Sequence, residues 1–205
     1  MNRRLPALGL LATPALLALA ASPALAHHPF GMAEGQQLSP WMGLVSGIGH
    51  PLLGPDHLLF LVAIAFVGLR RPAAWILPLL ATGLLGSALS LVVPPTAGLA
   101  AGAELLASLS LVVAGVVALG GLPAATLLPA IAVHGYVLGG MVVGAEPTPL
   151  AAYFLGLLLS QAVLLLVACR LGRTLLGHLR PSARLVLAGV WIGLGGAFAL
   201  SLLVA

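Results

Sequence analysis

The amino-acid sequence predicts an all-α, polytopic membrane helix bundle with about six transmembrane helices after a cleaved signal peptide. Composition is the first observation, because 61% of the 205 residues are hydrophobic and only 6% are charged. Soluble domains contain about 25% charged residues. The second observation is a series of apolar segments, each close to the ~20 residues needed to span a hydrocarbon core. The third is the distribution of arginine, which agrees with the number of segments.

The first 26 residues are predicted to be a signal peptide. Two arginines begin it, an apolar stretch follows, and Ala24-Leu25-Ala26 is a small-x-small cleavage site. The alternative is an uncleaved signal anchor, which the three prolines of this region disfavour because they break a spanning helix. Both interpretations place segment 27–40 in the periplasm and leave 41–205 as the transmembrane helical domain.

Apolar segments of spanning length follow one another through the transmembrane domain. Prolines, glycines and charged residues separate them, as expected for the ends of spanning helices. We place the spans at residues 41–69, 73–93, 99–121, 124–143, 149–171 and 184–204.

All basic residues of the chain are arginines, and their positions test this number of spans. With the N-terminus outside, the loops after the first and fifth spans are both cytoplasmic. Every arginine beyond the signal region falls there, as the positive-inside rule requires: Arg70, Arg71, Arg170, Arg173, Arg180 and Arg184. The isoelectric point near 10.7 therefore reflects inner-membrane topology, and no nucleic acid is expected as a partner.

The residue inventory also limits the chemistry. Without any lysine the chain has neither a Walker-type phosphate loop nor a Schiff-base lysine. If the protein moves a solute, ATP hydrolysis does not occur in this chain. No tightly bound cofactor and no enzymatic activity are expected.

The first span contains the most informative residues, in the run Gly49-His50-Pro51-Leu52-Leu53-Gly54-Pro55-Asp56-His57. An Asp at the centre of a membrane helix costs about 2.5–3.5 kcal/mol on insertion scales, so it requires a partner or a function. As a straight helix, segment 41–69 would be about 42 Å long against a core of about 30 Å. A helix broken near Pro51–Pro55 resolves both problems, and secondary transporters place ion sites at such breaks.

His50, Asp56 and His57 are the donors expected for a metal site. Neutral imidazole suits Ni, Co, Cu and Zn, and a carboxylate can bind the metal or orient a histidine. Even on an unbroken helix the two histidines would share one face, because they are two turns apart. The alternative is a purely structural hydrogen-bonded Asp–His pair that fixes the kink.

The run His-Pro-x-x-Gly-x-Asp-His, just after a signal peptide that exposes an N-terminal histidine pair, resembles the HupE/UreJ family of nickel/cobalt permeases. The resemblance covers the whole mature chain and includes Glu104 near the start of the third span. It implies that His50, Asp56 and His57 act in metal transport. It also implies a link to the maturation of a metalloenzyme, hydrogenase or urease.

The fourth span departs from the family pattern. Where the family has His-Gly-x-Ala-His-Gly-x-Glu, this chain reads His134-Gly135-Tyr136-Val137-Leu138-Gly139-Gly140-Met141. The first histidine is kept, whereas Leu138 and Met141 replace the second histidine and the glutamate. His134 is therefore a candidate third imidazole ligand, and the alternative is a core histidine with a structural hydrogen bond.

Three further residues are weaker candidates for metal contact. Glu104 lines the outer mouth of the pathway or simply sits at a helix N-terminus, where its charge is favourable. His27 and His28 offer an amine and two imidazoles for capture of metal in the periplasm, or belong to a polar tail.

These observations favour a secondary permease in the inner membrane that transports a divalent transition metal, nickel or cobalt, as its substrate. One alternative is a membrane metal sensor or accessory protein that does not transport, since two fourth-span ligands are replaced. The other is an intramembrane hydrolase using Ser46 and His134, although the chain has no Gly-x-Ser-x-Gly motif. The sequence does not indicate the oligomeric state.

Overall fold

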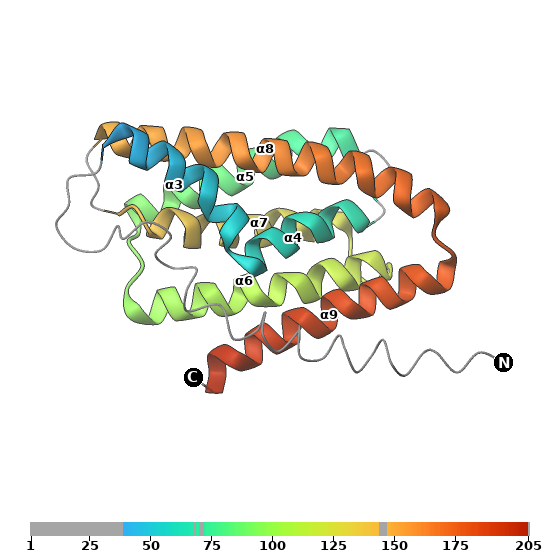
Figure 1. Ribbon diagram of the computed structural model, residues 1–205. Helices are drawn as coiled ribbons and strands as arrows, with labels where there is room; N and C mark the ends of the chain where they lie inside the picture. Colours follow the sequence, from blue (N-terminus) through green and yellow to red (C-terminus); the bar gives the residue numbers. More distant parts are fainter. Residues whose placement is uncertain (1–38, 68, 70–71, 144–146, 205) are drawn as a thin grey trace.

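The structure is a computed structural model that describes residues 39–67, 69, 72–143 and 147–204. The predicted signal peptide therefore lies outside the described residues. Over the described part the chain is all-helical, as the composition predicts (Figure 1). The elements are α3 (Pro40–Leu53), α4 (Pro55–Phe66), α5 (Pro72–Val92), α6 (Ala97–Ala118), the short 3-10 helix η1 (Ala124–Thr126), α7 (Leu127–Gly140), α8 (Pro147–His178) and α9 (Pro181–Val204).

The helices have the length and composition of membrane spans. Among the described residues, 4 helices are long and apolar enough to cross a membrane by themselves: α5, α6, α8 and α9. The α3–α4 pair passes the same test as one bent unit, and η1 with α7 forms a shorter apolar helix. Large apolar side chains face outward, such as Leu77 at 75% and Leu203 at 69% exposed, as expected for surfaces that contact lipid.

The first predicted span is broken at Gly54, where α3 and α4 meet at an angle of 68°. Pro55 begins α4, where its missing N–H is no loss and its fixed φ favours a helix start. With 14 and 12 residues, the two halves are about 21 and 18 Å long, so neither alone spans a hydrocarbon core. The break predicted near Pro51–Pro55 is thus confirmed, although Pro51 itself remains inside α3.

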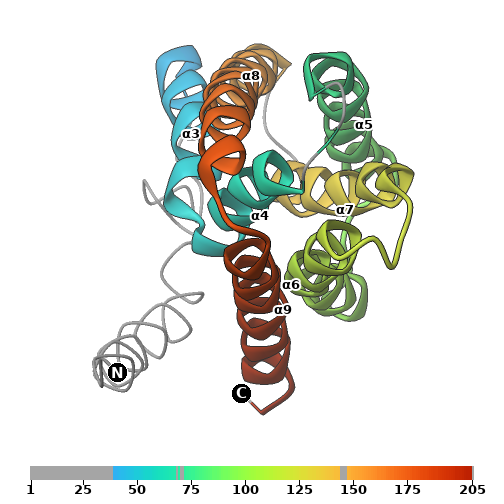
Figure 2. The same ribbon diagram turned by 90° about the vertical axis from the view of Figure 1, so that its right-hand side faces the viewer.

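The helices pack most closely in three pairs. α3 packs on α8, α5 on α7 and α6 on α9, while α4 contacts both α8 and α6. Seen end-on, α4 and α7 lie toward the middle of the bundle (Figure 2). The first residues of α4 and the middle of α7 therefore lie where several helices can supply side chains.

Glycines allow the closest of these contacts. A Cβ at Gly47 of α3 would collide with the backbone of Tyr153 in α8, and one at Gly135 of α7 would collide with the backbone of Gly83 in α5. Close backbone approach of this kind is what small residues provide in membrane helices. Gly102 of α6 differs, because a Cβ there would meet nothing within 4 Å.

Helix α8 is longer than the fifth predicted span, because it continues through His178. At 32 residues it is about 48 Å long, so one end extends beyond a core of about 30 Å. Arg170 and Arg173 therefore lie on a helix, where a loop was expected. The end of α8 and the start of α9 lie at the same end of the bundle as the end of α4 and the start of α5 (Figure 1).

Candidate metal centre

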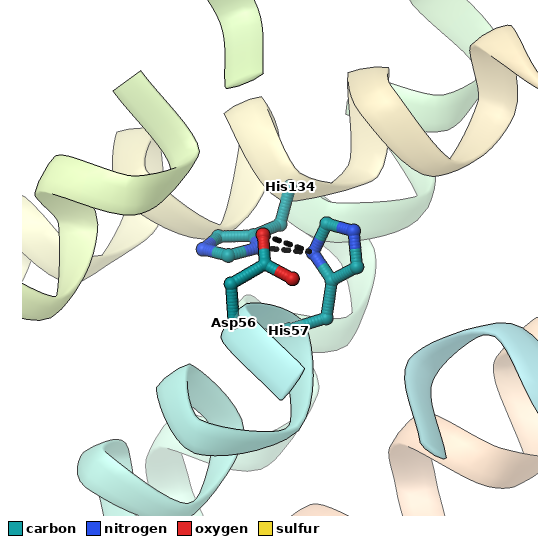
Figure 3. A group of neighbouring side chains, drawn as sticks. All are labelled: Asp56, His57 and His134. Atoms are coloured by element: carbon teal, nitrogen blue, oxygen red, sulfur yellow. Dashed lines mark hydrogen bonds and ion pairs between the residues drawn. The ribbon is translucent and has the colours of Figure 1, made fainter. Parts of the chain in front are cut away.

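Two helix segments bring three potential ligands together at the break. Asp56 and His57 lie in the first turn of α4, and His134 lies in the middle of α7. One ligand atom from each of the three residues lies within 4.8 Å of the others, and the three side chains point toward one another (Figure 3). Nδ1 of His57 is 2.6 Å from Nδ1 of His134 and 3.8 Å from Oδ2 of Asp56.

The hydrogen bonds around His134 define which ring nitrogens carry protons. The Ser110 hydroxyl, on α6, donates to the carbonyl of Ala107 at 2.5 Å, because a carbonyl can only accept. Its oxygen then accepts from Nε2–H of His134 at 2.6 Å. Neutral His134 therefore presents a lone pair at Nδ1, and His57 donates its Nδ1–H to that lone pair. One proton thus occupies the space between the two imidazoles.

Packing fixes the orientation of the His134 ring and keeps it dry. Phe60, one turn along α4 from Asp56, stacks on His134 with ring centroids 4.3 Å apart and planes 10° apart. His57 and His134 are only 6% and 3% exposed. The Asp56 side chain is 26% exposed, so the carboxylate marks the more open side of the group.

His50 lies beside this group, in the last turn of α3. Its ring meets that of His57 edge-on, with centroids 5.9 Å apart. The Tyr153 hydroxyl, on α8, donates to the carbonyl of Leu138 at 2.7 Å, so it accepts from Nδ1–H of His50 at 3.2 Å. This contact leaves the lone pair of neutral His50 on Nε2. The structure thus places His50 next to the three ligand atoms but outside their cluster.

The other predicted contacts lie elsewhere. Glu104 is on α6, about 9 Å along the helix axis from Ser110, and does not belong to the three-residue group. It is also beyond the first turn of α6, so the helix N-terminus does not explain it. His27 and His28 lie outside the described residues.

Several residues around the site were not identified by sequence reasoning. Ser110, Tyr153 and Phe60 contact the histidines directly, and Gln161 shares a small cavity of about 10 Å³ with His57 and His134. Serine, tyrosine and phenylalanine are common in membrane helices, so no local signal distinguishes these positions. The serine beside His134 is Ser110, from α6, and not Ser46.

The donor set fits a divalent transition metal. Two imidazole nitrogens that bind one ion at about 2.0–2.1 Å lie roughly 3–3.4 Å apart. The two Nδ1 atoms, now 2.6 Å apart, would separate by less than about 1 Å to admit it. Two imidazoles and a carboxylate, with Ser110 holding one ring, are a ligand and support arrangement typical of such metals.

Comparison with known proteins places the chain in a family. The searches of curated proteins and of solved structures each found no match. The family model described as HupE / UreJ protein matches residues 15–199, most of the chain. That range includes Asp56, His57 and His134. The chain therefore belongs to the HupE/UreJ family, a transporter-type family associated with nickel and cobalt.

Proposed function

We propose that this protein is a secondary permease that carries a divalent transition-metal ion, nickel or cobalt, across the inner membrane. The observation that carries the proposal is the group of Asp56 with the buried His57 and His134 at a helix break within the bundle. Ionisable residues inside a membrane domain mark ion pathways, and broken helices are where secondary transporters bind ions. Family membership independently supports metal transport.

The direction and energy source follow from charge. The arginine distribution supports a periplasmic N-terminus, and we propose that uptake is inward from that side. For a divalent cation the membrane potential supplies about 4.6 kcal/mol per 100 mV. Either this potential alone or a coupled ion drives the flux. By its family we expect the ion to serve maturation of a metalloenzyme, hydrogenase or urease.

Metal flux into proteoliposomes tests the proposal. Purified protein with an entrapped metal-sensitive dye, given Ni²⁺, Co²⁺, Cu²⁺ or Zn²⁺ outside, should show flux above empty vesicles for at least one ion. His57→Ala should abolish that flux because it removes a central donor. His178→Ala is the matched control, since His178 is exposed near the end of α8, and it should transport normally.

Two results would contradict the proposal. One is wild-type protein that moves none of the four metals, and the other is His57→Ala protein with full flux. Wild-type protein that binds metal without moving it would instead support a sensor or accessory role. Leu138, which lines the small cavity in place of a donor, is the feature that favours this second candidate.

A further inference from the structure

We infer that the side-chain oxygen of Gln161 is an additional ligand of the transported ion, supplied by α8. The inference rests on the proposed function and adds a donor from a third helix. Gln161 is 2% exposed, and its Oε1 atom is fully buried with no hydrogen-bond partner among the described residues. Leaving a buried polar atom unpaired is costly, so such atoms in native proteins need an explanation.

The position of Gln161 supplies that explanation. It lines the cavity of about 10 Å³ whose wall also contains His57 and His134. That volume suits one water-sized occupant, so a single small ion in the cavity would lie beside Gln161 and both histidines. The remaining wall is mostly apolar, formed by Pro51, Phe60, Leu61, Ile131 and Leu138, and it offers the amide oxygen little other polar company.

A glycine leaves room for the amide. A Cβ at Gly83 of α5 would come within 3.3 Å of Oε1 and 3.5 Å of Ile131, itself part of the cavity wall. Oε1 therefore lies close to Gly83 of α5, beside a residue of the cavity wall.

Amide oxygen completes a chemically reasonable ligand set. His57 and His134 supply nitrogen and Asp56 supplies a charged oxygen, all from α4 and α7. Gln161 would add a neutral oxygen from α8. A fourth donor brings the set to the coordination number of tetrahedral sites. Gln161 would also add an oxygen donor to a site in which Leu138 and Met141 replace the histidine and glutamate of the family pattern.

Cobalt binding to the purified full-length protein tests the inference, with Co²⁺ visible absorption as the readout. Gln161→Leu should weaken Co²⁺ affinity by about 10- to 100-fold and change the visible spectrum, because one ligand is lost. Gln161→Glu keeps an oxygen and should restore binding. Ser160→Ala is the control: its hydroxyl bonds to the Gly47 carbonyl, away from the cavity, so wild-type affinity and spectrum are expected.

Thermal stability separates a ligand from a structural residue. Without metal, Gln161→Leu should melt at a higher temperature than wild type, since it removes an unpaired buried atom. A structural glutamine would give a lower melting temperature and an unchanged spectrum. Gly83→Ala, which crowds Oε1 without replacing it, should also perturb the spectrum.

The outcomes distinguish this inference from the proposed function. If His57→Ala loses Co²⁺ binding while Gln161→Leu keeps wild-type affinity and spectrum, Gln161 is not a ligand and the permease proposal stands. If wild type binds no Co²⁺, or His57→Ala binds it normally, the inference about Gln161 fails, and the flux assay decides the permease proposal separately.

Discussion

Ser110 fixes the tautomer of His134 in the candidate metal centre through a hydrogen bond. By accepting from Nε2–H of His134, it keeps the Nδ1 lone pair of that ring directed at His57. Partners that orient a metal-binding histidine commonly affect metal affinity as strongly as some ligands do. Ser110 is therefore expected to affect metal affinity without contacting the ion.

Replacing Ser110 with alanine should weaken metal binding without unfolding the protein. His134 would lose the partner that holds its tautomer, and Co²⁺ affinity should fall about 10- to 100-fold. Titration of purified protein measures this change. Ser108→Ala is the matched control, because Ser108 is also buried on α6 and no hydrogen bond joins it to His134 among the described residues. Equal affinities for the two variants would contradict the role given to Ser110.

Part of the site can be predicted from the sequence. Asp56 and His57 were evident because a charged group in an apolar span is costly. His134 is suggested because the fourth span keeps the first histidine of the family pattern. Ser110, Tyr153 and Gln161 could not be found, because their proximity depends on how α6 and α8 rotate about their axes. No local pattern in those helices encodes that rotation.

Close packing holds α7 against α5 at the level of the site. Gly135 follows His134 directly, and a Cβ there would collide with the backbone of Gly83. The Ser87 hydroxyl, on α5, donates to the carbonyl of Gly135 at 2.8 Å. These contacts hold α7 closely against α5 beside His134.

Gly135→Ala should therefore destabilise the protein, by about 1–3 kcal/mol, because overpacking must separate α5 and α7. Gly102→Ala, at an open position on α6, should be neutral or slightly stabilising, since alanine favours helix over glycine by about 1 kcal/mol. Thermal unfolding in detergent compares the two. The packing argument would be wrong if both variants melted with wild type.

Local rules predicted the break between α3 and α4 but not the length of α8. Proline and glycine act through their own backbone, so Gly54-Pro55 fixes a helix boundary. Residues 170–178 combine arginine and glycine with leucine, which is compatible with a helix or a loop. The structure shows that these residues continue the helix, which their composition alone does not indicate.

The whole bundle has one end rich in arginine. Arg180 lies between α8 and α9, and Arg184 lies on α9. The end of α4 and the start of α5 lie at the same end of the bundle (Figure 1). The start of α8 lies at the other end. From the positive-inside rule we propose that the arginine-rich end faces the cytoplasm.

Cysteine labelling in intact cells should confirm this orientation. In a Cys169→Ser background, Thr148→Cys at the start of α8 should react with an impermeant maleimide added outside. Ser182→Cys at the start of α9 should react only after the membrane is permeabilised. Both side chains are exposed, so accessibility differs only by membrane side. The reverse pattern would invert the proposed direction of uptake.

The pairing of α3 with α8 sets an order for biosynthesis. Ser160 and Gly47, which join these helices, are separated by 113 residues, and Tyr153 is 103 residues from His50. At about 5–20 residues synthesised per second, the partner of α3 emerges roughly 5–20 s after it. Until then the two short halves of the first span have no permanent neighbour on that side. A chain that stops before α8 therefore contains Asp56, His57 and His134 but lacks Tyr153, which accepts the hydrogen bond from His50.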